Sequence, residues 1–120
     1  MNDNPLSEKS FSFALRIIRL SRYLNNEKRE FVLAKQVLRS GTSIGVQTRE
    51  AQYALSKADF AHKLTVALKE ANETEYWLQL LVQSGLINDR MFQSIEPEIK
   101  SLLKLLISSI KTTKQKMSNA

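Results

Sequence analysis

The chain has 120 residues, a length that suits one domain with a substantial hydrophobic core. It has no Cys, which excludes disulfides, thiolate zinc sites and cysteine nucleophiles and favours a reducing compartment. Lys and Arg outnumber Asp and Glu by 18 to 12, and the net charge of +6 favours polyanionic partners such as nucleic acid, although a basic surface without a specific partner would show the same excess. No apolar run approaches the ~18 residues of a membrane span, and the first residues do not resemble a secretory signal, so we expect a cytoplasmic protein with no membrane segment.

The first predicted helix runs from Ser7, a residue type that caps helix N-termini, to Leu24, and it is preceded by a flexible N-terminus at about residues 1–6. A four-three repeat places one set of apolar residues on a single face. This set is Phe13, Ile17, Leu20 and Leu24. Further apolar residues widen the apolar arc to roughly 200°, about twice the stripe that one bundle needs. These are Phe11, Ala14, Leu15 and Ile18. The excess is typical of a subunit that buries apolar surface in an oligomer.

The second predicted helix runs from Glu27 to Ala54, after a turn at Asn25-Asn26. Along its core-facing side the same four-three repeat forms a line of residues that we call its seam. This seam is Leu33, Val37, Ser40, Ile44, Gln47, Ala51 and Ala54. Gly41 and Gly45 lie inside it, and an alternative is a break into two helices at residues 40–43. We favour one continuous helix because the seam keeps its phase on both sides of the glycines. Glycines one turn apart would let another helix approach closely.

The third predicted helix begins at Ser56, which with Asp59 resembles a capping box, and ends at Gly85 as a left-handed C-cap. Its seam is Phe60, Leu64, Ala67, Ala71, Thr74, Leu78 and Leu81. The fourth starts at Asn88-Asp89, with a kink or restart expected at Pro97 and a flexible tail at about residues 112–120. Its seam is Ile95, Ile99, Leu102, Leu103, Leu106 and Ile110. Four seams with short connections predict an all-α, antiparallel up-down four-helix bundle that forms one domain over residues 1–120.

Polar residues interrupt the core pattern of the second and third helices. We predict a structural polar layer in which Arg39 pairs with Glu70 or Glu73, while Ser40 and Gln47 complete the hydrogen bonds. Such a layer would fix the register of the helices more than it would add stability.

Catalytic chemistry is poorly supported. The only imidazole, in Asp59-x-x-His62, has no second copy, so neither a zinc nor a di-iron site is expected. Ser40, Thr42 and Ser43 lack a general base held by a third group, and Glu50 with Glu70 and Glu73 would need a cleft to act as acid and base. We therefore expect no enzymatic activity, no metal and no cofactor.

Two basic stripes are the candidate nucleic-acid-binding surfaces. They are Arg16, Arg19 and Arg22 on the first helix and Lys100, Lys104, Lys111 and Lys114 on the fourth. A stripe of this size is also typical of a solvated helix face. Repeated around an oligomer, however, it would contact several phosphates. Because no aromatic residue is interleaved with the lysines, we expect binding driven by charge and shape, without reading of bases.

The sequence resembles the bacterial four-helix bundle proteins encoded in intervening sequences of 23S ribosomal RNA genes, a superfamily that includes the accessory protein of diversity-generating retroelements. The resemblance covers about Phe11 to Ile110. The motifs are R-S-x-x-S-I at Arg39–Ile44, E-A at Glu50–Ala51, S-K-A-D-F at Ser56–Phe60, A-x-K-E-A at Ala67–Ala71 and E-T-E-Y-W-L at Glu73–Leu78. One departure is Gln47, where the family usually has Asn.

The resemblance implies a ring-like homopentamer without established enzymatic activity. In the retroelement relatives it also implies a basic surface that contacts nucleic acid and a reverse transcriptase. The leading hypothesis is a non-enzymatic homo-oligomer that binds RNA or DNA through basic stripes. The alternative is a structural or protein–protein interaction module whose basic surface docks an acidic protein.

Overall fold

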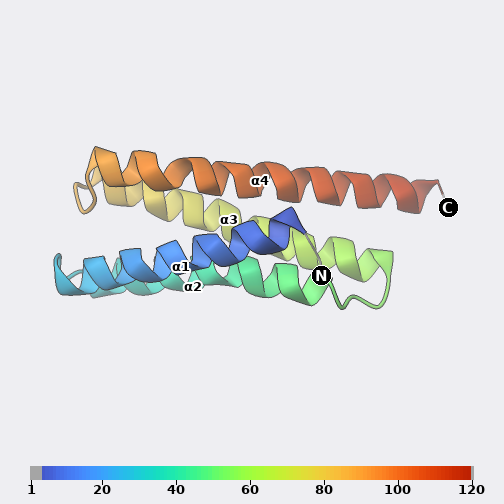
Figure 1. The fold of residues 1–120 in the computed structure, drawn as a ribbon, viewed down its shortest axis with the longest axis horizontal. Helices are drawn as coiled ribbons and strands as arrows, with labels where there is room; N and C mark the ends of the chain where they lie inside the picture. Colours follow the sequence, from blue (N-terminus) through green and yellow to red (C-terminus); the bar gives the residue numbers. More distant parts are fainter. Residues whose placement is uncertain (1–3, 120) are drawn as a thin grey trace.

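The computed structural model describes residues 4–119, which form four helices: α1 (Pro5–Asn26), α2 (Phe31–Ala51), α3 (Lys57–Gln83) and α4 (Asp89–Ser118). The α1–α2 and α3–α4 connections lie at one end of the rod and the α2–α3 connection at the other, so successive helices are antiparallel (Figure 1). The rod measures 52 × 24 × 21 Å. No strand occurs among the described residues, and the predicted all-α up-down bundle is confirmed.

The start of α1 differs from the prediction. Asn4, not Ser7, is the N-cap, and its side-chain oxygen accepts a hydrogen bond from the Leu6 amide at 3.0 Å. Pro5 then occupies the first turn, where its missing N–H costs nothing. Leu6 is buried, so the segment expected to be flexible is folded from Asn4 onward; residues 1–3 lie outside the described residues.

The α1–α2 turn lies later than predicted. Asn25 and Asn26 are helical, and the chain reverses over residues 27–30, where Arg29 takes a left-handed conformation with φ 55°. The Glu30 amide donates to the Leu24 carbonyl at 2.9 Å, and the Glu30 side chain caps α2. A four-residue connection therefore closes this hairpin, a common length between antiparallel helices.

Helix α2 is continuous through both glycines, as predicted from the seam phase. Gly41 faces Ile17 of α1 so closely that an added Cβ would lie 2.8 Å from two Ile17 carbons. Gly45 lies over Ser10, where an added Cβ would be 3.6 Å from the Ser10 carbonyl oxygen, an ordinary contact. Only Gly41 is therefore required by the close approach of α1 to α2.

The capping residues of α3 and α4 lie at the predicted positions. Ser56 accepts from the Asp59 amide at 3.0 Å, Asn88 accepts from the Met91 amide at 2.9 Å, and Gly85 has φ +82°. The Asp59 carboxylate accepts from the Leu55 amide instead of the Ser56 amide, so the capping box is displaced by one residue.

Helix α4 continues through Pro97 and on to Ser118, past the segment where a flexible tail was expected. Pro97 is exposed, so its missing N–H and its ring lie on the solvent side. Thr113 is buried, so the side of α4 that carries it is covered this far along the helix, and its hydroxyl donates to the Ser109 carbonyl of the same helix at 2.8 Å.

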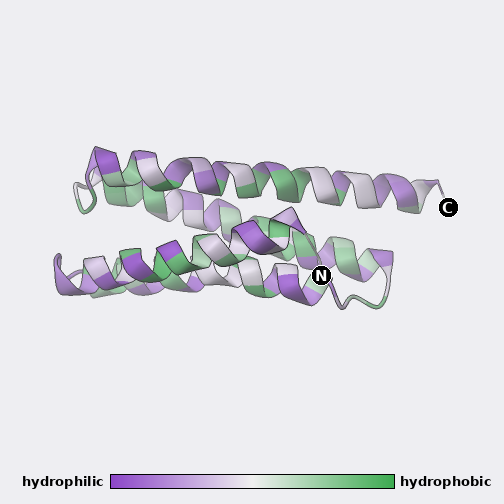
Figure 2. Ribbon diagram, viewed as in Figure 1, coloured by the Kyte–Doolittle hydropathy of each residue, from purple (hydrophilic) through white to green (hydrophobic). Residues whose placement is uncertain are grey.

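The apolar seams of the four helices meet along the axis of the rod, and the apolar residues gather on the inward faces (Figure 2). Helices α1 and α4 make the sparsest contact of all adjacent pairs. Because α4 extends beyond the N-terminus of α1 (Figure 1), its last turns have no α1 beside them. Grooves between α1 and α4 and an exposed end of α4 follow from this arrangement.

Candidate nucleic-acid interface

The predicted polar layer is a surface bridge between α2 and α3. Arg39 donates to Glu70 at 3.2 Å and to Glu73, and Trp77 Nε1 also donates to Glu73. The hydrogen bond to Glu73 and the charge of both carboxylates raise the pKa of Arg39 above its ordinary value. The Arg39 side chain is 48% exposed, however, so this bridge is not the buried ion pair that the core pattern suggested.

The buried polar contact lies beneath that bridge. Thr74 of α3 donates to Ser40 of α2 at 2.8 Å, and both residues are fully buried. Gln47 takes no part, because the seam passes through Thr48, which is buried and bonds to the Ile44 carbonyl. The prediction of Gln47 as a member was wrong because either residue 47 or residue 48 satisfies the helical spacing after Ile44.

Replacing Arg39 by methionine should therefore destabilise the protein by only about 1 kcal/mol, since exposed ion pairs contribute about that or less. Chemical denaturation of Arg39→Met would measure this loss. Lys63→Met is the control, because Lys63 forms a weaker exposed pair with Glu50 at 3.6 Å, and we expect it to be near neutral. A loss of about 3 kcal/mol or more would mean that the bridge behaves as a buried pair.

The three arginines of α1 have different environments. Arg16 turns to α4, where its guanidinium donates to the Ser94 carbonyl at 2.9 Å, to the Ser94 hydroxyl at 2.8 Å and to Glu98. Within the described residues, Arg16 is therefore not a free side chain as Arg19 and Arg22 are, because α4 supplies its partners. Arg19 and Arg22 are exposed and have no carboxylate within 4 Å among residues 4–119.

The lysines of α4 share one face. Lys100 lies 2.9 Å from a carboxylate oxygen of Glu75 on α3, and this hydrogen bond raises the pKa of Lys100. Lys104, Lys111 and Lys114 are exposed and have no such pair in the described part of the chain. Three of the four predicted lysines are therefore available to a ligand.

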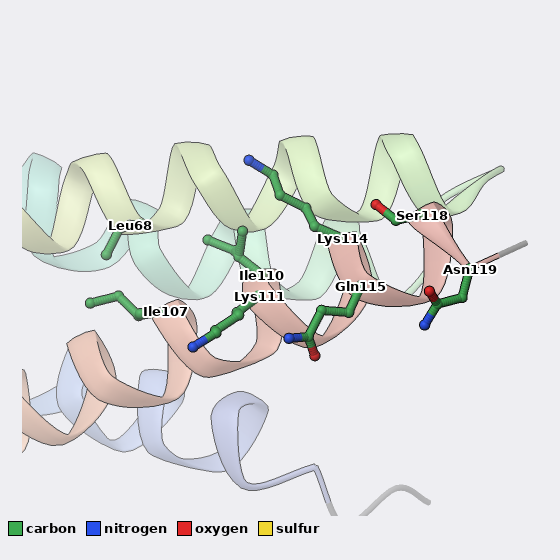
Figure 3. Close-up of a pocket in the computed structure, with 8 residues that line it drawn as sticks. All are labelled: Leu68, Ile107, Ile110, Lys111, Lys114, Gln115, Ser118 and Asn119. Carbon is green, nitrogen blue, oxygen red and sulfur yellow. The ribbon is translucent and has the colours of Figure 1, made fainter.

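The end of α4 forms a shallow groove beside α3 (Figure 3). Its apolar floor comes from Leu68, Ile107 and Ile110, and Lys111 and Lys114 rise from successive turns on either side. Ile107 is 53% exposed in the middle of the lysine face. The stripe is thus amphipathic, a feature that the lysine pattern alone did not indicate.

The sequence prediction missed one basic residue. Arg90, in the first turn of α4, lines a groove with Arg19 and Tyr23 from the last turns of α1. An up-down bundle places the end of its first helix beside the start of its fourth, so the topology could have identified this pairing.

Apolar side chains are exposed on two different faces. Phe11, Val46 and Tyr53 line a groove between α1 and α2 and are 66%, 52% and 75% exposed. On α3, Tyr76 and Leu80 are exposed one turn apart. Isolated exposed apolar residues are common, but an aromatic-lined groove is typical of a contact surface.

The described residues offer little for catalysis. Among residues 4–119 no three His, Cys, Asp or Glu side chains gather as metal ligands. The hydroxyls of Thr42 and Ser43 donate to backbone carbonyls of their own helix, and His62 is exposed on α3. Within the same range, no helix has the length and apolar character needed to span a membrane.

Comparison with known proteins identifies the family. Residues 2–108 match the family described as 23S rRNA-intervening sequence protein. A crystal structure of a protein of unknown function from the S23 ribosomal protein family of Bacteroides thetaiotaomicron VPI-5482 is 54% identical to this chain. The similarity covers 88% of this chain and 98% of that one, with a TM-score of 0.87. No curated protein matches. The chain therefore belongs to the 23S rRNA-intervening sequence protein family.

Proposed function

We propose that this protein is a non-enzymatic, homo-oligomeric bundle in the cytoplasm that binds RNA through the exposed cationic side chains of α1 and α4. The observation that carries the proposal is the set of arginine and lysine side chains that no carboxylate neutralises among residues 4–119. On α1 and α4 this set includes Arg19, Arg22, Arg90, Lys104, Lys111 and Lys114. Binding of this kind is dominated by phosphate contacts and depends strongly on salt. The link of the family to 23S ribosomal RNA genes makes RNA the first polyanion to test.

The oligomer supports this function by repetition. A ring requires two different surfaces on each subunit that fit one another. The groove of α1 and α2 that contains Phe11 and Val46, and the exposed Tyr76 and Leu80 on α3, supply two such apolar surfaces. A closed ring, which we propose to be a pentamer, would set several copies of the α4 lysines on one particle. Its affinity for a long RNA would then exceed that of a single subunit by avidity.

Salt-dependent RNA binding tests the proposal. Fluorescence anisotropy with a labelled single-stranded RNA should show log affinity falling linearly with log salt, by roughly 0.7 for each phosphate neutralised. Replacing Lys104, Lys111 and Lys114 together by glutamine removes three candidate contacts and should lower the slope by roughly 2 and the affinity at least tenfold. Because all three are exposed, the fold should be unchanged.

A matched triple variant controls for net charge. Lys28, Lys35 and Lys57 are exposed on other parts of the surface, and their replacement by glutamine changes the net charge equally. We expect this variant to bind RNA as the unmodified protein does. Equal losses in both variants, or heparin binding as tight as RNA binding, would mean that the affinity is for polyanions in general. Binding that ignores salt would contradict the mechanism.

An acidic protein segment is a second candidate ligand. The apolar floor at Ile107 and Ile110 between Lys111 and Lys114 would suit a helix with one apolar face and flanking carboxylates. Under this alternative, the Lys104, Lys111 and Lys114 variant would lose a protein partner while the protein itself bound no RNA at low salt. The relation to retroelement accessory proteins, and with it contact with a reverse transcriptase, stays a prediction that comes from the sequence resemblance.

A further inference from the structure

A second basic site lies in the groove between α1 and α4, near the end of the bundle that carries the α1–α2 and α3–α4 connections. The groove has a volume of about 400 Å³, within the range of small-ligand sites. It exists because α1 and α4 make the sparsest contact in the bundle. Among residues 4–119, no carboxylate contributes to its lining.

Arg16 joins the two helices beside this groove. Its guanidinium joins α1 to α4 through the Ser94 carbonyl, the Ser94 hydroxyl and Glu98. With its charge matched by Glu98, Arg16 lines the groove without an unpaired charge of its own.

The remaining lining combines two kinds of chemistry. Arg19 lies on α1 and Arg90 on α4, and neither has a carboxylate within 4 Å among residues 4–119. The same groove is lined by the half-buried Tyr23 and by the buried apolar residues Ile87 and Ile95. Guanidinium groups bind phosphate bidentately, whereas an aromatic and apolar surface binds a flat base.

We propose that this groove holds one nucleotide of single-stranded RNA, with its phosphate between Arg19 and Arg90 and its base against Tyr23 and the apolar floor. The assignment rests on the proposed RNA-binding function and adds base contact to it. A paired base cannot leave its stack without unpairing, so the groove selects single strands over duplex. The expectation of charge-driven binding without base contact then applies to the α4 lysines alone.

Three variants separate the base contact from the charge. Tyr23→Leu should weaken binding of a single-stranded RNA roughly 5- to 100-fold, the factor expected for loss of one stacked base, and leave the salt slope unchanged. Arg90→Gln should weaken binding and lower the slope by roughly 0.7, because it removes one phosphate contact. Lys28→Gln is the control for loss of one charge, since Lys28 is exposed in the α1–α2 connection outside the groove, and duplex RNA should not respond to Tyr23→Leu.

Titration with uridine monophosphate, followed by NMR of the Met91 methyl and the arginine side chains, tests the groove independently of RNA binding. We expect the Met91 and Arg90 signals to shift, and to shift less with inorganic phosphate. Failure of Tyr23→Leu to affect single-stranded RNA, or unchanged Met91 and Arg90 signals at millimolar nucleotide, would overturn the groove proposal while RNA binding through α4 could still stand. Absence of any RNA binding by the unmodified protein would instead refute the proposed function. Arg90 is exposed at the start of α4, so Arg90→Gln keeps the test valid if Tyr23→Leu unfolds.

Discussion

Gly41→Ala is expected to destabilise the protein by about 1–2 kcal/mol, although alanine is the better helix former by about 1 kcal/mol. The new Cβ would lie 2.8 Å from both Cγ atoms of Ile17, a residue that is fully buried. A β-branched side chain in a helix has one strongly preferred rotamer, so Ile17 cannot turn away. Either α1 and α2 must move apart, or side chains in the core must adopt strained conformations. Chemical denaturation would measure the loss.

Gly45→Ala is the matched control on the same helix, one turn away. Its Cβ would make only ordinary contacts at 3.6 Å or more, so the gain in helix propensity should stabilise the protein by up to about 1 kcal/mol. The two variants thus differ in sign although the substitution is identical.

A double-mutant cycle locates the clash. Ile17→Ala alone should cost about 2–5 kcal/mol by leaving a cavity, and adding Gly41→Ala on that background should cost nothing further. If Gly41→Ala were as stable as Gly45→Ala, the α1–α2 contact would be looser than the structure has it.

Val46→Asp is expected to weaken self-association by at least 100-fold and to release single subunits. Val46 is 52% exposed in the groove of Phe11 and Tyr53, and the proposed ring would cover it. An unpaired carboxylate buried at an interface loses several kcal/mol of solvation. Sedimentation velocity at micromolar concentration would measure the change in subunit number.

The control is Val32→Asp, the same substitution near the start of α2. Val32 is 71% exposed and lies outside the groove, so the subunit number should not change. Dissociation by both variants would place the interface elsewhere, and an unmodified protein that sediments as a monomer would refute the oligomer itself.

Local interactions made much of the fold predictable from the sequence. Ser56, Asn88 and Gly85 mark helix ends because each bonds or bends within its own few residues, and the structure has them as predicted. Asn4 and Pro5 are equally local signals of a helix start, although the prediction began the helix at Ser7. The continuity of α2 also followed from the sequence, because a single seam phase spans both glycines.

Contacts between helices that are distant in sequence were decided by the tertiary structure. Arg39 and Glu73 lie on the two helices of one hairpin, so their pairing was predictable. Whether the pair is buried or exposed depended on how α2 and α3 are rotated about their axes against the core. Arg16 pairs with Glu98 across 82 positions, and no periodicity relates the two. Arg90, by contrast, lies near the end of α1 because of the up-down topology, which the sequence did predict.

The sequence by itself determined the helices, their apolar faces and the antiparallel order, because periodicity and capping act within a few turns of one chain segment. The tertiary structure decided which basic side chains stay unpaired, because an arginine or lysine keeps its charge available only where the facing helix offers no carboxylate. Helix α4 offers Glu98 to Arg16 and none to Arg19, and that difference depends on the rotation and spacing of α1 against α4. Those two quantities result from packing of the whole core, which no local pattern encodes.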